Sequence, residues 1–102
     1  MREYKFKRGF KATNERLEEM LRKYFGNFEV DGDSYVVRNF GALEELRTKL
    51  SNGKLIVSSK SKSVDNELAY QTIKTYNKFL EELTGYTAKE RQKLLRKEVE
   101  GE

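Results

Sequence analysis

The stretch Leu50-Ser51-Asn52-Gly53-Lys54-Leu55-Ile56-Val57 decides the fold of this 102-residue chain. Asn-Gly is strongly favoured in two-residue β-hairpin turns, because both turn positions need a positive φ angle. A two-residue loop pairs Leu50 with Leu55 and Thr48 with Val57, which places all four side chains on one face of a sheet. The stretch therefore predicts an antiparallel hairpin.

A second hairpin precedes this one, where Phe28-Glu29-Val30 and Ser34-Tyr35-Val36-Val37 flank the turn pair Asp31-Gly32. A two-residue loop at that pair sets Phe28 opposite Tyr35. Residues 42–50 are ambiguous, since Leu43, Leu46 and Leu50 also fit a helical spacing. We favour a short turn at 42–45 followed by a strand, because the Asn-Gly hairpin needs a partner for residues 55–57.

Helical periodicity appears in two places. Residues 14–25 carry one apolar stripe and end before Gly26, while a longer stripe starts after the capping residue Asp65 and ends at Gly85. The longer stripe consists of Ala69, Ile73, Tyr76, Leu80 and Leu83. Thr87-Ala88-Lys89-Glu90 is a capping box that predicts a last helix. At the N-terminus, residues 2–8 alternate aromatic and basic side chains, which is typical of a half-buried strand.

The order is thus strand, helix, four strands and two helices, which predicts an α+β fold. We expect a two-layer domain with an antiparallel sheet of about five strands. This order resembles TATA-binding-protein-like and helix-grip folds, an analogy of topology that carries little information about function. The chain is expected to form a single domain, residues 1–102, in which an α+β core (1–86) precedes a basic C-terminal helix (87–99).

Charge is concentrated at two places in a chain of formal net charge +4. Residues 1–11 and residues 86–97 each carry a local net charge of +4, and the rest of the chain is acidic overall. Such asymmetry marks candidate partner surfaces, although it is also found on plain solvated faces. The candidate nucleic-acid-binding residues are Lys5, Lys7, Arg8, Lys11, Lys89, Lys93, Arg96 and Lys97.

Aromatic side chains interleave with the first basic segment, as they do on nucleic-acid platforms that combine phosphate contacts with base stacking. In a strand, however, the rings of Tyr4 and Phe6 and the cations of Lys5 and Lys7 face opposite ways. We therefore favour an amphipathic strand over a stacking platform.

The composition argues against several classes of function. The chain has no Cys and no His, which removes disulfides, thiolate catalysis, the usual general base and the commonest metal ligands. Adjacent glutamates such as Glu81-Glu82 diverge by about 100° on a helix and cannot share a site. We expect no catalytic residue, no metal and no cofactor. With no apolar run long enough for a membrane span, the expected location is cytoplasmic.

The segments Met1-Arg2-Glu3-Tyr4-Lys5-Phe6-Lys7-Arg8-Gly9, Phe40-Gly41-Ala42-Leu43 and Tyr76 to Lys93 resemble a family of small archaeal proteins of unknown function. The Gly-Tyr-Thr-Ala-Lys-Glu-Arg block, residues 85–91, is the most specific part of this resemblance. It implies an archaeal origin and a standalone domain, and carries over no activity, cofactor or site residue.

The leading hypothesis is a non-catalytic binding protein that contacts RNA or DNA backbone through its basic N-terminal strand and C-terminal helix. One alternative is a protein-interaction or homodimerisation module, whose partner would be an acidic protein surface or a second copy. An unrecognised enzyme ranks third. The leading hypothesis depends on a question that the sequence leaves open, namely whether the two basic segments meet on one surface.

Overall fold

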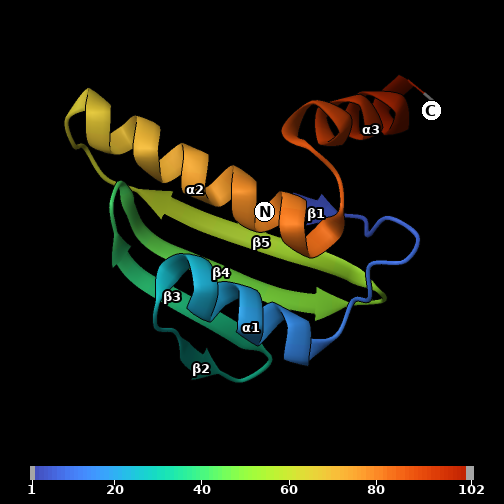
Figure 1. Cartoon of the computed structure of the whole chain (residues 1–102), viewed down its shortest axis with the longest axis horizontal. Helices are drawn as coiled ribbons and strands as arrows, with labels where there is room; N and C mark the ends of the chain where they lie inside the picture. The colour runs from blue at the N-terminus through green and yellow to red at the C-terminus, as the bar shows by residue number, and fades with distance from the viewer. Residues whose placement is uncertain (1, 101–102) are drawn as a thin grey trace.

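The computed structural model describes the backbone of residues 2–100 and the side chains of residues 2–94. In chain order, the elements are β1 (Arg2–Tyr4), α1 (Asn14–Phe25), β2 (Glu29–Asp31), β3 (Ser34–Phe40), β4 (Leu43–Ser51), β5 (Lys54–Ser61), α2 (Asn66–Thr84) and α3 (Ala88–Glu100). The strands form one antiparallel sheet in the order β1-β5-β4-β3-β2 (Figure 1). The predicted α+β fold and its order of elements are confirmed.

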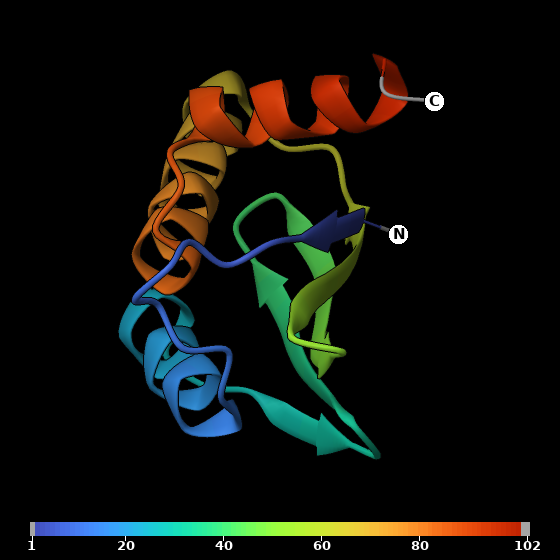
Figure 2. The ribbon, with the colours of Figure 1, turned by 90° about the vertical axis from the view of Figure 1, so that its right-hand side faces the viewer.

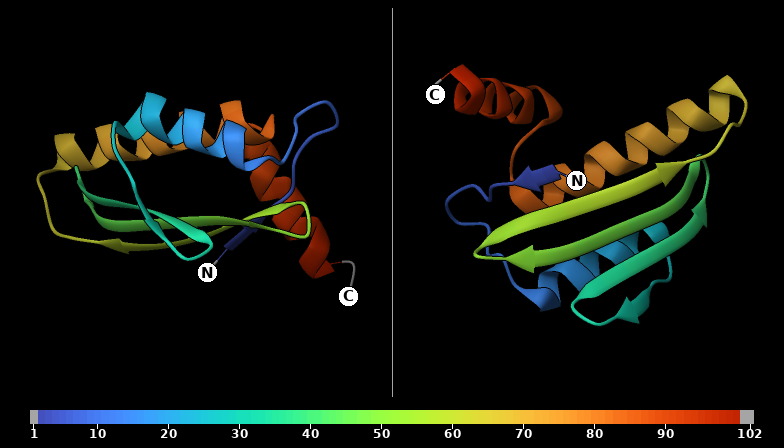
Figure 3. Two further views of the ribbon diagram at one scale, coloured as in Figure 1. Left: turned by 90° about the horizontal axis from the view of Figure 1, so that it is seen from below. Right: turned by 180° about the vertical axis from the view of Figure 1, so that it is seen from behind.

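Two layers make up the body of the domain. Helices α1 and α2 lie side by side on one face of the sheet, whose other face carries no helix (Figure 3). After α2, the chain turns sharply, and α3 crosses beside the β1 edge of the sheet rather than joining the helical layer (Figure 2). None of the helices within the described residues is long and apolar enough to span a membrane.

The Asn52-Gly53 hairpin forms in the predicted register. Leu50 pairs with Leu55 and Thr48 with Val57, and both turn residues have positive φ angles, 53° and 75°. Leu55, Val57 and Thr48 are buried beneath the helices. The hairpin thus supplies the centre of the sheet and part of the core.

Residues 43–51 form a strand, as favoured, but the predicted turn at 42–45 is wrong. The turn is earlier, at Gly41-Ala42, and β4 already begins at Leu43. A register shift between Leu43 and Glu45 explains the helix-like spacing of the leucines. The irregularity turns Leu43 to the same face as Leu46, so both are buried although they are three residues apart.

The first hairpin differs from its prediction by one residue. Asp31 pairs with Ser34 and Val30 with Tyr35, so the loop consists of Gly32 and Asp33 and Phe28 is not paired with Tyr35. Gly32 has a φ angle of 61°, and glycine at the first loop position suits a type II′ turn. The two rings nevertheless pack edge to face, with centroids 5.1 Å apart.

Strand β1 is shorter than the predicted strand at residues 2–8. Tyr4 pairs with Leu55, one residue from the start of β5, so the sheet offers residues after Lys5 no further partner. The amide of Lys7 instead donates to the carbonyl oxygen of Thr84, at the end of α2, over 2.7 Å. Residues 5–13 are therefore a loop that leads from the sheet edge to the helical layer.

The core lies between the sheet and helices α1 and α2. Helix α1 buries Leu17, Met20, Leu21 and Phe25 of its predicted stripe. On α2, the predicted stripe is wrong in its first half, since Ile73 is 59% exposed and Thr72 is buried in its place. The Thr72 hydroxyl accepts a hydrogen bond from the backbone amide of Ala42 and donates one to the carbonyl oxygen of Leu68. This contact with the β3–β4 turn sets the rotation of the helix and leaves Ile73 outside the core.

Candidate nucleic-acid interface

The first basic segment lies on the loop between β1 and α1. Two interactions join this loop to the C-terminal end of α2, namely the Lys7–Thr84 bond and the Phe10 ring, which packs directly on the Cα of Gly85. The amide of Phe10 also donates to the carbonyl of Lys7 over 2.9 Å, which closes a tight turn. The cations of this segment are thus presented from a loop fixed at both ends.

Arg16, on α1, holds the same region together. Its guanidinium donates to the carbonyl oxygens of Lys11 (2.9 Å), Leu83 (3.0 Å) and Glu82 (3.1 Å). The last turn of α2 has no basic residue of its own, so Arg16 supplies the cation that the negative end of a helix dipole favours. The loop, α1 and the end of α2 therefore form one connected unit.

Helix α3 starts with the predicted capping box. The amide of Glu90 donates to the Thr87 hydroxyl over 3.1 Å, and the amide of Thr87 donates to the Glu90 carboxylate over 3.0 Å. These hydrogen bonds to Thr87 are the main reason why the pKa of Glu90 is lowered. Since α3 begins only three residues after Gly85, its first turn lies close to the loop of the first basic segment.

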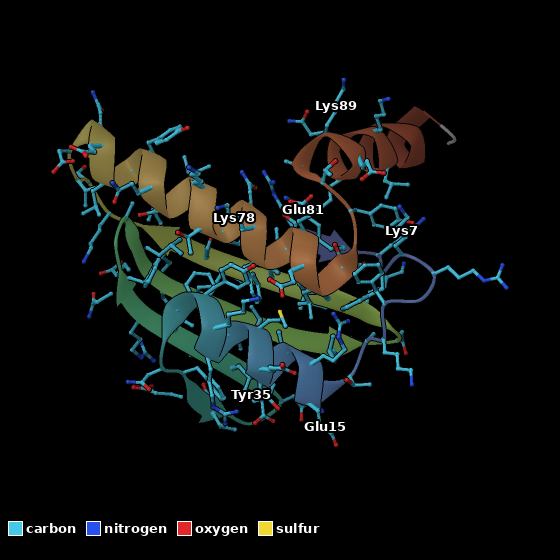
Figure 4. All side chains as sticks on the ribbon, viewed as in Figure 1. Lys7, Glu15, Tyr35, Lys78, Glu81 and Lys89 are labelled. Atoms are coloured by element: carbon cyan, nitrogen blue, oxygen red, sulfur yellow. The ribbon has the colours of Figure 1, made fainter. Side chains whose placement is uncertain are left out.

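The two basic segments meet at this point. The ammonium group of Lys7 lies 6.0 Å from the centroid of the Tyr86 ring. The positive charges of Lys7 and Lys93 also both lower the pKa of Glu90. We call the exposed cations around this junction (Lys7, Lys89 and Lys93) the basic corner. In the view of Figure 4, Lys7 lies on the loop below α3, and Lys89 lies on the upper, outer side of that helix.

The remaining candidates are less closely associated with this corner. Lys5, Arg8 and Lys11 are exposed along the loop, and Lys11 lies on its far side, next to α1. The backbone of Arg96 and Lys97 belongs to α3, but their side chains fall outside the described residues. Their contribution to the basic corner stays a prediction.

Arg91 belongs to the second basic segment by sequence, yet its side chain is only 6% exposed. It donates to the Tyr86 carbonyl (2.6 Å) and to the Asn77 side chain (3.1 Å), and it lies 5.9 Å from the centre of the Tyr4 ring. Burial lowers its pKa. Arg91 therefore anchors α3 to α2 and β1, a role that sequence reasoning missed because helical spacing alone does not identify a buried cation.

The aromatic residues of the first segment do not form a stacking platform. Tyr4 is buried, Phe6 packs against the core, and the Phe10 ring lies between Gly85 and the Arg16 guanidinium. The favoured alternative, in which Tyr4 and Phe6 face the core, agrees with these positions. Base stacking on these rings would require them to leave the body of the protein.

The helix-free face of the sheet is less suited to binding phosphate. Its two arginines are already paired with carboxylates. Arg38 contacts Glu29 and Glu45, both at 3.1 Å, and Arg47 contacts Asp31 at 2.7 Å. These neighbouring carboxylates would repel phosphate, so the basic corner is the better candidate.

Comparisons with known proteins identify the family. A family model described as "Domain of unknown function (DUF5611)" matches residues 1–97. The chain belongs to this family. Among solved structures, it is similar to the NMR solution structure of a hypothetical protein from Thermoplasma acidophilum, with 32% sequence identity and a TM-score of 0.65. The match covers 93% of this chain and 97% of the other. A comparison with curated proteins gave no match.

These findings confirm the resemblance to a small archaeal family of unknown function that the sequence motifs indicated. The DUF5611 match extends over all the elements from β1 into α3, so the basic corner lies within the family domain. Neither comparison assigns a ligand or an activity, and the function has to be argued from the residues of this chain.

Proposed function

We propose that this DUF5611 protein binds nucleic acid through the basic corner, by contacts to the phosphate backbone and with little sequence specificity. The observation that supports this function is that the Lys7 ammonium group lies 6.0 Å from the centroid of the Tyr86 ring, at the start of the second basic segment. Two basic segments from opposite ends of the sequence thereby bring their charges close together. Cations gathered in this way release counterions from a phosphate backbone when they bind it.

The acidic residue within the corner does not cancel this surface. The Glu90 carboxylate is used in the capping box of α3, where it accepts the Thr87 amide. Lys89 and Lys93 project from the same helix, one turn apart, and both are exposed. The corner therefore keeps an excess of positive charge on a rigid support formed by the loop and the first turns of α3.

The proposal is tested by fluorescence anisotropy with labelled single-stranded and duplex RNA and DNA at several salt concentrations. We expect affinity to fall steeply with the logarithm of salt concentration. The double variant Lys7→Glu/Lys93→Glu should weaken binding at low salt by about tenfold or more and reduce the salt slope. Lys60→Glu, at an exposed position on the helix-free face of the sheet, is the control for a change in net charge.

Two results would overturn the proposal. One is the absence of binding to every probe at low salt. The other is an equal loss of affinity per reversed charge in Lys60→Glu and in the double variant, which would mean that only the net charge matters. Thermal unfolding of each variant ensures that a loss of binding is not a loss of fold.

The second candidate function is self-association or binding to another protein. Tyr70 and Ile73 lie three residues apart on α2 and are 67% and 59% exposed, so they form an apolar strip on the surface. Light scattering at high protein concentration tests self-association directly. A dimer that Tyr70→Lys dissociates would favour this candidate, whereas a monomeric mass throughout would exclude a homodimer.

A further inference from the structure

A cavity of about 340 Å³ lies between the second half of β5 and α2, apart from the basic corner. Its wall contains hydroxyl groups, apolar side chains and one arginine, among them Ser59, Ser61, Ile73, Tyr76 and Arg2. Figure 1 shows α2 running along β5 above this region. The volume falls within the range of cavities that hold small molecules.

The sheet leaves hydrogen-bonding groups open at this cavity. Strand β1 pairs only with residues 55–57, so among the described residues the rest of β5 has a strand neighbour on one side alone. In a two-residue hairpin, the backbone N–H and C=O groups of the two residues that flank the loop point toward the partner strand. Those of the next residue along each strand point away from the partner, and this alternation continues to the end of the strand. Ser59 accordingly directs its backbone N–H and C=O toward the open edge, and its side chain shares the face of Val57, toward α2.

Positive charge is present at the same place without an acidic partner. Arg2 pairs with Val57 across the strands and so lies on the cavity face of the sheet. It lines both this cavity and a smaller one of about 170 Å³, which also contains Arg91. No carboxylate is among the described residues that line either cavity. The hydrogen bonds of Arg91 go to neutral oxygens, so its charge also adds to the positive potential there.

An apolar wall completes the cavity. Ile73 sits at its edge with 59% of its surface exposed, although the sequence places it on the apolar stripe of α2. The ring of Tyr76 lines both cavities, and its hydroxyl lies 3.4 Å from that of Tyr4. Thr72 is already engaged by Ala42 and Leu68. The polar groups that can turn to a ligand are the serine hydroxyls and the guanidinium of Arg2, which also hydrogen-bonds Tyr4.

We infer that this cavity binds a small organic phosphate. The phosphate group would contact the guanidinium of Arg2, the hydroxyls of Ser59 and Ser61 and the open backbone amide of Ser59, since phosphate oxygens accept from all three kinds of donor. The organic part would cover Ile73 and pack on the Tyr76 ring. This site is independent of the basic corner, because the two share no residue.

The experiment is an NMR titration of the ¹⁵N-labelled full chain with adenosine monophosphate, ribose 5-phosphate, inorganic phosphate and adenosine. We expect adenosine monophosphate to shift the amide signals of residues 58–61 and 72–76. Adenosine and inorganic phosphate alone should each bind about tenfold more weakly, because each makes only part of the contacts. Ribose 5-phosphate measures what the base adds.

Two variants with the same change in charge locate the site. Arg2→Gln should weaken adenosine monophosphate binding by about tenfold, the loss expected for a charge-assisted contact to phosphate. Lys60→Gln, next to Ser59 but on the opposite face of the sheet, should leave it within about twofold. Ser59→Val removes one hydroxyl and should weaken binding to a smaller extent. Arg2 is exposed at the start of the chain, so Arg2→Gln should keep the unfolding midpoint unchanged.

The inference is overturned if all four probes leave these signals unchanged at about 10 mM, or if Arg2→Gln and Lys60→Gln weaken binding equally. It is also overturned if the protein forms a dimer that buries Ile73, because the cavity would then be closed by a second copy. Absence of nucleic-acid binding to the wild-type protein would overturn the proposed function and not this inference, since the two sites are tested with different residues and different ligands.

Discussion

Arg16 of α1 and Leu83 of α2 are joined by a 3.0 Å hydrogen bond from the guanidinium to the main-chain oxygen. The bond links two helices that lie side by side, and it gives a C-terminal helix end the positive charge it lacks in its own sequence. The same guanidinium reaches Lys11, so one side chain orders the loop that carries the first basic segment.

Replacing Arg16 should therefore destabilise the domain. We expect Arg16→Ala to lower the free energy of unfolding by about 1–2 kcal/mol, because three carbonyl oxygens lose a charged donor. Urea denaturation measures this difference. Arg8→Ala, which removes an exposed arginine from the neighbouring loop, should change stability by less than about 0.5 kcal/mol. Similar losses in the two variants would contradict the role of Arg16.

A pH-dependent contribution comes from Glu82, on α2. Its carboxylate pairs with Lys23 at 2.6 Å and accepts a hydrogen bond from the Tyr24 hydroxyl, and these two bonds lower its pKa. A lowered pKa means that the interaction stabilises the fold above the ordinary value of 4.5 and is lost as the pH falls through the folded-state pKa.

The matching experiment compares wild type with Glu82→Gln by chemical denaturation between pH 7 and pH 3. Wild type should be the more stable protein at pH 7, and the difference should shrink steadily in acid below pH 4.5. A difference that stays constant over this range would show that the charge of Glu82 is not involved.

The Gly41–Thr72 contact predicts a strong effect of adding one methyl group. A Cβ at Gly41 would collide with the Thr72 hydroxyl, which holds α2 against the β3–β4 turn, and the φ angle of 54° is itself unfavourable for alanine. Gly32 has a similar φ angle, 61°, but open space around it. We expect Gly32→Ala to cost about 1 kcal/mol and Gly41→Ala about 1–3 kcal/mol more. Equal unfolding midpoints would mean that the contact does not constrain the helix.

Tyr76 gives a prediction in alkaline solution. Burial is the main cause that raises its pKa above the ordinary value of 10.0, followed by the hydrogen bond with Tyr4. The folded protein therefore keeps the proton longer than the unfolded chain does, and stability is lost as the pH rises above about 10. Tyr76→Phe keeps the ring and removes the ionisable group, so it should lose less stability than wild type between pH 9 and pH 11. Parallel losses in the two proteins would refute this.

Arg91 is expected to control the attachment of α3. Arg91→Ala removes the bonds to Tyr86 and Asn77 and the contact with the Tyr4 ring. Hydrogen exchange should then show faster exchange in α3 while the amides of β3, β4 and β5 keep their protection. Lys93→Ala, on an exposed position of the same helix, serves as the control. Loss of protection throughout the sheet would mean that residues 1–86 do not form a core of their own.

Local signals in the sequence account for most of the fold. Asn52-Gly53 predicted its hairpin to the residue because turn and strands are adjacent in the chain. Two of the errors, in the length of β1 and in the buried face of α2, came from long-range contacts. The length of β1 is limited by where β5 begins, and the rotation of α2 is set by Thr72 meeting a turn 30 residues earlier in the sequence. Neither limit can be seen in a helical or alternating pattern.

In the candidate site, too, local features could be predicted from the sequence and long-range contacts could not. The exposed lysines and the capping box at Glu90 could be predicted, since both follow from nearest neighbours on a helix or loop. Two features could not be predicted, namely the position of Lys7 beside Tyr86 and the burial of Arg91. Both depend on the packing of the C-terminal segment against the N-terminal one, and these two segments are far apart in the sequence. Charge counts alone treat Arg91 and Lys93 as equivalent, although only Lys93 is exposed.

The pairing of β1 with β5 also has a consequence for folding kinetics. Arg2 and Val57 are partners across 55 positions of the chain, whereas the hairpins between β2 and β5 close over a few residues each. Since distant contacts pay more loop-closure entropy, the hairpins should form early and β1 should dock last. During synthesis, β1 would then remain unpaired until more than half of the chain has been made.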